Sequence, residues 1–140
     1  MSAFVLDASY TLTLTWCFLD RATPNTDAAL RRLEAALDIA IVPAIWRIEV
    51  ANALGKSVVR RKLTLQRAQE IWEELVLLPI RQSAPPLEIP KLLELAVDHN
   101  ISVYDACYLQ EARLERLPLA TNDHDLKAAA ESFGLAVMTP

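Results

Sequence analysis

The sequence predicts an α/β domain in which helices cover both faces of a central parallel sheet. Short runs typical of strands alternate with longer runs typical of helices along the whole chain, and this alternation is characteristic of parallel sheets. The 140 residues are 53% hydrophobic, which suits one compact domain with a sizeable core. We find no internal repeat, low-complexity tract or linker, and we therefore expect residues 1–140 to form a single domain.

The individual elements follow from the spacing of apolar residues and from turn signals. In chain order, we expect a strand at 3–7, helices at 8–19 and 24–38, a strand at 39–42, helices at 45–61 and 65–78, a strand at 79–83, helices at 91–100 and 102–116, a strand at 118–121, a helix at 122–133 and a strand at 135–138. The threonine-rich run 8–19 favours a strand by propensity. We nevertheless predict a helix there, because a strand would leave no crossover between parallel neighbours.

Several helix ends carry capping signals. The helix at 24–38 has Leu30, Leu33 and Leu37 at helical spacing. The capping signals are Asn25 or Thr26 and Thr64 at N-termini, Pro90 in a first turn, and Asn100 and Gly134 at C-terminal ends. These signals predict where the helices begin and end, and the connections between the predicted elements are short.

Composition excludes several classes of protein. A net charge of −4 does not indicate nucleic-acid binding, although a local basic patch is compatible with it. Two glycines are too few for a phosphate-binding loop, and His99 and His124 lack the spacing of zinc ligands. Cys17 and Cys107 lie in apolar contexts and are interpreted as core residues of a reducing compartment. Asp7 interrupts the apolar N-terminal run and no stretch approaches a membrane span of ~20 residues, so we expect a soluble cytoplasmic protein.

Four acidic residues fall where ligands bind in open α/β sheets, beyond the carboxyl ends of the strands. Asp7 ends the first strand, Glu49 lies early in the helix after the second, Asp105 begins the helix at 102–116, and Asp123 follows the strand at 118–121. Two carboxylates about 4 Å apart repel by roughly 4 kcal/mol at an effective dielectric of ~20. Such a cluster takes up protons or binds a cation, and oxygen ligands suit Mg²⁺ or Mn²⁺. The pattern therefore points to metal-assisted phosphoryl chemistry.

Each acid also has a simpler interpretation. Asp7 suits a helix N-cap, Ser102 with Asp105 a capping box, and Asp123 with Asp125 a cap and first-turn acid. Glu49 shares a helical stripe with Asn52, Lys56 and Arg60, opposite the apolar stripe of Trp46, Val50, Leu54 and Val58, and this suits a solvated face. Four unrelated explanations for four acids at the same edge of the sheet are less probable than one pocket that all four share.

A basic stripe continues from Glu49 toward the end of its helix. It contains Lys56 and Arg60, is followed by Arg61 and Lys62, and can be joined by Arg47. A solvated helix end explains such a run. The alternative is a track for a phosphate backbone that leads to the metal. Aromatic residues for base stacking are not obvious, since the tryptophans are interpreted as core.

Four short blocks, in this order, resemble the conserved blocks of PIN-domain nucleases. They are FVLDAS (4–9), VPAIWRIEVANAL (42–54), ISVYDACYLQEA (101–112) and PLATNDHDLKAAA (118–130). The likeness is greatest to VapC-type toxins of toxin–antitoxin pairs and covers nearly the whole chain. It implies a three-layer α/β/α PIN-like fold and a divalent-metal-dependent endoribonuclease.

The resemblance also implies roles for individual residues. The family's acidic positions fall on Asp7, Glu49, Asp105 and Asp123, and the polar positions that accompany them fall on Ser9, Asn52 and Thr121, with Asp125 as an additional acid. We expect Asp7, Asp105 and Asp123 to hold Mg²⁺ or Mn²⁺, with Glu49 directly or through water. Arg47, Lys56, Arg60 and Arg61 are the expected RNA-binding residues. The resemblance further implies a homodimer and a cognate antitoxin that blocks the acidic site and covers an apolar groove.

Three other readings compete with this one. A receiver-like signalling domain is a similar acidic-pocket fold, but Asp7 lacks a neighbouring acid and no lysine follows the last strand. A non-catalytic PIN-like module that binds RNA or protein is a second alternative, against which the complete set of acids argues. A related nuclease for DNA or flap structures is a third, and the small size of the chain argues against it.

Overall fold

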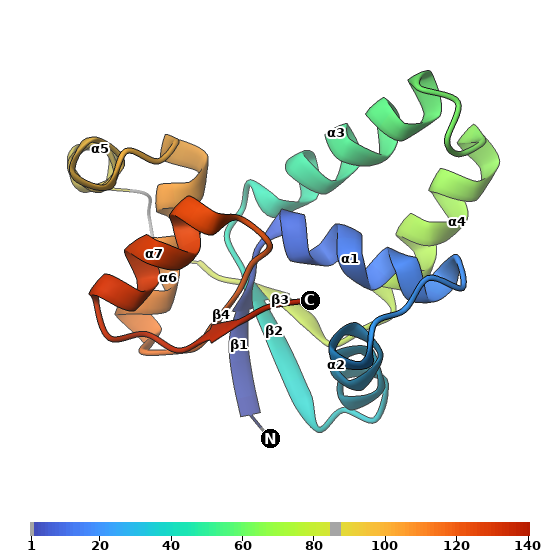
Figure 1. Cartoon of the computed structure of the whole chain (residues 1–140), viewed down its shortest axis with the longest axis horizontal. Helices are drawn as coiled ribbons and strands as arrows, with labels where there is room; N and C mark the ends of the chain where they lie inside the picture. Colours follow the sequence, from blue (N-terminus) through green and yellow to red (C-terminus); the bar gives the residue numbers. More distant parts are fainter. Residues whose placement is uncertain (1, 85–87) are drawn as a thin grey trace.

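The computed structural model describes residues 2–84 and 88–140, which form one parallel sheet with helices on both sides (Figure 1). The strands are β1 (Ser2–Leu6), β2 (Asp38–Val42), β3 (Ile80–Gln82), β4 (Leu119–Ala120) and β5 (Val137–Met138). Their order across the sheet is β3-β2-β1-β4-β5, so β1 lies at the centre. In the register, Leu6 pairs with Ala120, and the carboxyl ends of β1 and β4 therefore finish side by side.

Seven helices in the described part of the chain form two outer layers. They are α1 (Ala8–Phe18), α2 (Pro24–Glu34), α3 (Trp46–Val59), α4 (Leu65–Val76), α5 (Ile89–His99), α6 (Val103–Glu115) and α7 (His124–Ser132). The helices α1 to α4 contact one another on one side of the sheet, and α5 to α7 contact one another on the other (Figure 1). The predicted α/β class and the three-layer arrangement are thus confirmed. None of the helices that the structure describes is both long and apolar enough to cross a membrane.

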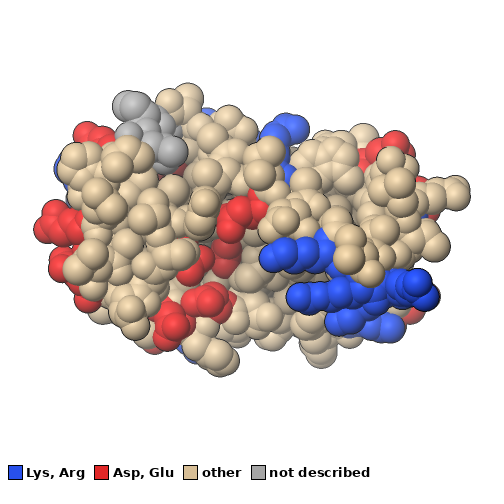
Figure 2. Space-filling model, turned by 90° about the horizontal axis from the view of Figure 1, so that it is seen from above, with Lys and Arg blue, Asp and Glu red and all other residues tan. Residues whose placement is uncertain are grey.

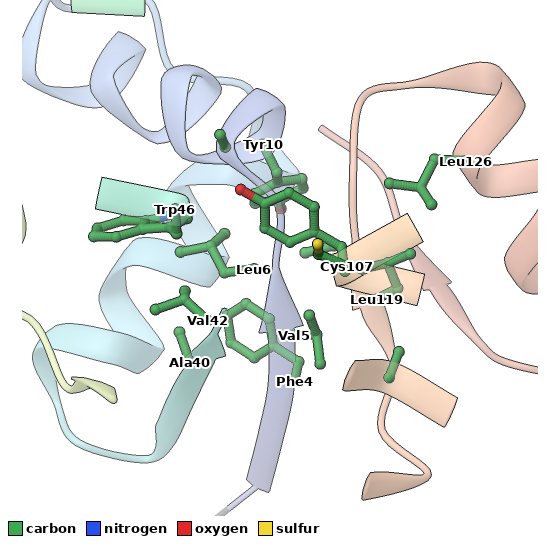
Figure 3. Packing of buried hydrophobic residues seen from close by; sticks show 14 of the residues in the cluster. Phe4, Val5, Leu6, Tyr10, Ala40, Val42, Trp46, Cys107, Leu119 and Leu126 are labelled. Atoms are coloured by element: carbon green, nitrogen blue, oxygen red, sulfur yellow. The ribbon is translucent and has the colours of Figure 1, made fainter. Parts of the chain in front are cut away.

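The core is built around β1. Phe4, Val5 and Leu6 are buried between the side chains of β2, β4 and the helices, as Figure 3 shows. Trp46 at the start of α3 and Tyr108 in the middle of α6 are among the largest fully buried side chains. Trp46 lies on the apolar stripe expected for its helix, and Trp72 of α4 packs against it with ring centroids 5.8 Å apart.

The threonines of α1 are compatible with a helix because their hydroxyls bond to the helix's own backbone. Thr13 donates to the Tyr10 carbonyl and Thr15 to the Leu12 carbonyl, both at 2.6 Å. Thr11 donates to the Asp7 carbonyl at 3.0 Å and accepts from the Trp46 indole N–H at 2.8 Å. These bonds satisfy polar groups that would otherwise be buried without a partner. They also fix the start of α3 against the start of α1.

Two local predictions in the second helix were wrong. Thr23, rather than Asn25 or Thr26, caps α2, and Thr26 completes a capping box with it. Pro24 occupies the first turn, which requires the cap to precede it. The helix ends at Glu34 instead of residue 38, so Leu37 falls outside it and is 53% exposed.

The other predicted capping signals are confirmed. Thr64 caps α4, and α5 has a proline in its first turn. Asn100 adopts a left-handed conformation at the end of α5, and Gly134 does so after α7 with φ of +73°. Neither of the cysteines is in a disulfide, and Cys107 is buried.

Candidate active site

Asp7 occupies the point where β1 passes into α1, and its side chain turns toward β4. It is at the N-cap position but makes no side-chain capping bond, so the simpler capping interpretation was wrong. Its Oδ2 instead accepts hydrogen bonds from Ser9 Oγ at 2.6 Å and Thr121 Oγ1 at 2.7 Å. Burial raises the pKa of Asp7 above its ordinary value, the two hydroxyl bonds oppose this rise, and the charge of Asp123 adds to it. The site therefore holds a buried carboxyl whose orientation is determined by two hydroxyls.

Ser9 and Thr121 also organise the loop after β4. The backbone N–H of Asn122 donates to Ser9 Oγ, and that of Asp123 donates to Thr121 Oγ1, both at 3.0 Å. Because the sheet register places Thr121 opposite Asp7, these bonds connect the ends of two strands that are far apart in the sequence. Ser9 and Thr121 thus contact Asp7 directly, and their role in the site stays a prediction.

Asp123 combines the two interpretations that the sequence left open. Its Oδ1 accepts from the backbone N–H of Leu126 at 2.8 Å and so caps α7. The residue is half-buried, and its charge acts on both Asp7 and Asp105. Capping engages one carboxylate oxygen, and the other is left for a second ligand.

Asp105 lies in the first turn of α6. Its backbone N–H donates to Ser102 Oγ at 3.0 Å, so Ser102 caps the helix. The carboxyl is half-buried, and burial raises its pKa to about 6, with further contributions from the charges of Asp7, Asp123 and Glu49. This acid therefore changes its charge close to neutral pH.

Glu49 projects from α3 toward α6. Tyr108 donates its hydroxyl to Glu49 Oε1 at 2.6 Å. Glu49 is half-buried, unlike Asn52, Lys56 and Arg60 on the same stripe, so a fully solvated face is the wrong description of this residue. Burial raises the pKa of Glu49, the Tyr108 bond opposes the rise, and the charge of Asp7 adds to it. Burial and the adjoining Glu49 carboxylate raise the pKa of Tyr108, which keeps its hydroxyl protonated as a donor.

The four acids thus face a common space at the carboxyl edge of the sheet. Figure 2 shows acidic side chains gathered across the middle of this face. Within residues 2–84 and 88–140, no three His, Cys, Asp or Glu side chains are grouped closely enough to hold a metal ion among them. The donor set nevertheless suits Mg²⁺, which keeps several of its waters and needs only one or two carboxylates. A divalent cation would also relieve the mutual repulsion that raises the pKa of Asp105.

Asn52 and Asp125 do not join the cluster. Both are exposed, and in the described part of the chain neither side chain has a hydrogen-bond partner. Tyr108, by contrast, was predicted only as a core residue. A hydroxyl-bearing side chain one turn after Asp105, on the same stripe, is the signal that could have suggested its contact with Glu49.

The basic residues lie beside the acidic space. Lys56, Arg60, Arg61 and Lys62 are exposed at the end of α3 and in the turn that follows it. Figure 2 shows a block of basic side chains next to the acidic ones, over the half of the molecule that contains α3 and α4. Arg47 is exposed as well, and its guanidinium lies over the Trp72 ring, 5.8 Å from the centroid.

Cys107 adjoins the acidic residues from within α6. It is buried, and burial raises the pKa of its thiol, which the nearby charges of Glu49 and Asp105 raise further. The thiol is thus protonated at neutral pH and forms part of the wall of the site rather than a nucleophile.

The PIN domain family model matches residues 4–132, which contain all four acids. The chain belongs to the PIN domain family. PIN domains are in general nucleases, and this membership removes the receiver-like alternative. No curated protein matches the chain significantly in sequence.

Solved structures share the fold. PAE2754 from Pyrobaculum aerophilum has a TM-score of 0.74 and 20% identity, with 98% of this chain and 91% of that chain covered. VapBC2 from Rickettsia felis, bound to a DNA fragment from their promoter, has a TM-score of 0.67 and 15% identity, with 98% of both chains covered. FitAcB from Neisseria gonorrhoeae has a TM-score of 0.61 and 19% identity, with 96% of both chains covered. At these identities the likeness establishes the PIN domain architecture.

Proposed function

We propose that this PIN domain is a divalent-metal-dependent endoribonuclease and the toxin of a type II toxin–antitoxin pair. The observation that carries the proposal is the convergence of Asp7, Glu49, Asp105 and Asp123 from four separate elements onto one edge of the sheet. The raised pKa values of Asp7, Glu49 and Asp105 fit a site in which a cation replaces protons. The resemblance of the sequence blocks to VapC-type toxins, and the shared fold with VapBC2 and FitAcB, support the toxin assignment.

In this proposal Asp7, Asp105, Asp123 and Glu49 would hold Mg²⁺ or Mn²⁺, one or two of them directly and the others through its waters, because no three acids of the described residues lie close enough to bind one ion among them. When bound there, such an ion would polarise a phosphodiester oxygen and lower the pKa of a water that it binds. Ser9 and Thr121 keep Asp7 Oδ2 oriented, and Tyr108 holds Glu49 Oε1 in the same way. The pKa of Asp105 is raised to about 6, so this carboxyl adds its negative charge to the cluster above that pH.

The basic residues provide a path for the substrate backbone. Lys56 and Arg60 continue the Glu49 stripe toward the end of α3, Arg61 follows the helix, and these exposed side chains can pair with backbone phosphates. Arg47 is exposed and can add a further contact, although Trp72 orients its guanidinium. The acidic residues alone would repel RNA, so the adjoining positive charge is needed for binding.

An antitoxin would require an apolar surface, and the chain offers one between α3 and α4. This groove has a volume of about 700 Å³, and Leu54, Val58, Leu65, Ala68 and Trp72 are among its lining residues. We propose that the antitoxin covers this groove and blocks the acidic site, that the toxin acts as a homodimer, and that it acts in the cytoplasm. Asn52, as a polar residue that accompanies the acids, and Asp125, as an additional acid, stay predictions.

Cleavage of RNA by Asp7→Asn tests the activity. The substitution retains the shape of the side chain and removes its negative charge, so we expect at least a hundredfold loss of Mg²⁺-dependent cleavage with an unchanged circular dichroism spectrum. Asp98→Asn, on the exposed surface of α5, is the matched control and should retain full activity. Full cleavage by folded Asp7→Asn, or cleavage that persists in excess EDTA, contradicts the proposal and leaves the non-catalytic PIN-like module as the better description.

A further inference from the structure

Glu111 is a buried acid that the proposed mechanism does not use. It lies on α6, is 5% exposed, and accepts a hydrogen bond at Oε2 from Ser83 Oγ at 2.7 Å. Its other oxygen, Oε1, is buried and has no hydrogen-bond partner among the described residues. Lys91 lines the same pocket and is paired with Glu88 at 2.8 Å. A buried acceptor without a donor is costly, which points to a ligand that donates to it.

Glu111 lines a pocket of about 220 Å³ that adjoins the acidic site. Its walls include Pro43, Ser83, Leu92, Cys107, Gln110 and Glu111. Pro43 follows β2 and Ser83 follows β3, so the pocket opens at the same carboxyl edge of the sheet as the acids. Glu111 is six residues beyond Asp105 on α6, or about 9 Å along the helix axis. Cys107, two residues after Asp105 on α6, also lines the pocket, so the pocket lies beside this acid.

The pocket has the size and chemistry for one nucleobase. The apolar side chains of Pro43 and Leu92 can contact the faces of a flat ring, and the Glu111 carboxylate only accepts hydrogen bonds. Guanine presents two adjacent donors, N1–H and the 2-amino group, which match a carboxylate. Uracil offers one N–H between two carbonyl oxygens, and these would repel the same carboxylate. Proteins that read single-stranded RNA commonly bind a splayed base by this edge.

We propose that this pocket binds a guanine base of the RNA substrate, next to the cleaved phosphate, and that Glu111 is the residue that selects it. The inference rests on the proposed nuclease activity for its biological meaning. Ser83 is a positioning residue, since its hydroxyl holds Glu111 Oε2, while Oε1 is buried without a donor among the described residues.

Cleavage of a random pool of single-stranded RNA, followed by sequencing of the new ends, tests the inference. We expect the wild-type protein to enrich guanine at one fixed position beside the cut by about tenfold, in the range for a two-bond contact to a base. Glu111→Gln replaces one acceptor oxygen of the carboxylate by an NH₂ donor group. It should abolish this enrichment while cleavage continues. Glu115→Gln, on the exposed surface of the same helix, should leave the enrichment unchanged. Cleavage without guanine enrichment, or enrichment that survives in Glu111→Gln, overturns the inference.

A binding assay separates this inference from the nuclease proposal. In EDTA, fluorescence anisotropy compares a hexauridine with the same oligonucleotide that carries one central guanosine. The wild-type protein should bind the guanosine-containing strand about tenfold more tightly, and Glu111→Gln and Ser83→Ala should both reduce this ratio toward one. A ratio near one in the wild-type protein refutes the guanine pocket, whereas absence of cleavage with the ratio intact refutes only the nuclease proposal.

Discussion

The hydrogen bond between Tyr108 and Glu49 joins the two helices that carry half of the acidic cluster. Tyr108 is fully buried, and its hydroxyl lies 2.6 Å from Glu49 Oε1. Tyr108→Phe removes this hydroxyl and retains the ring in the core. The substitution therefore tests whether the bond matters separately from the packing of the side chain.

The size of the effect follows from the charge of the acceptor. A hydrogen bond to a charged group contributes about 1.5–3 kcal/mol. Glu49 is half-buried and partly screened by water, so we expect Tyr108→Phe to lower the free energy of unfolding by roughly 1–2 kcal/mol at pH 7.5. The bond favours the ionised form of Glu49, so its loss raises the pKa of Glu49 further. At pH 4 Glu49 is largely protonated in the folded protein, and the destabilisation should be clearly smaller.

Urea unfolding at pH 4 and pH 7.5, without divalent metal, measures both values. The matched control is Tyr104→Phe, one turn earlier on the same helix, where the hydroxyl belongs to a side chain that is 61% exposed. This control should change the free energy of unfolding by less than about 0.5 kcal/mol. Equal destabilisation of Tyr108→Phe at both pH values, or destabilisation no greater than that of Tyr104→Phe, would show that the reasoning about Glu49 is wrong.

Two further predictions concern the other acids. Asp105 has a folded pKa of about 6 against an ordinary 3.8, so its contribution to stability is present at low pH and is lost as the pH rises from about 4 through 6. Asp105→Asn should therefore stabilise the metal-free protein more at pH 7.5 than at pH 4. Urea unfolding measures this effect, and a difference in the free energy of unfolding between variant and wild type that is the same at both pH values contradicts the prediction. Thr121→Val removes one of the two donors to Asp7 Oδ2 and should lower cleavage about tenfold, with circular dichroism as the check on folding. Activity equal to wild type in Thr121→Val would mean that Ser9 alone orients Asp7.

Much of the fold could be predicted because its signals are local. The alternation of strands and helices, the cap at Thr64 and the turns at Asn100 and Gly134 each depend on a few adjacent residues. The threonine-rich α1 was predicted from the need for a crossover, since its propensity alone favoured a strand. The error at α2 was also local. Pro24 is the first residue of the helix, so the cap is the residue directly before it, Thr23.

The candidate site could be predicted only as a set of positions. Strand ends and the starts of the helices that follow them identified all four acids, and the family resemblance assigned roles to them. Neither could show that Asp123 caps α7 while its charge acts on Asp7. Glu111 was absent from the prediction, because an acid in the middle of a helix does not reveal that one of its oxygens is buried without a donor.

The sequence by itself determined the elements of this protein and the strand ends at which its acids fall, because both depend on short-range periodicity and turns. Only the tertiary structure decided which side chains form hydrogen bonds with these acids. The strand order places β1 beside β4, so Thr121 reaches Asp7 across 114 residues, and the packing of α6 brings Tyr108 to Glu49 across 59. Such contacts depend on how the sheet is ordered and how the helices pack on it, and no local pattern encodes either one.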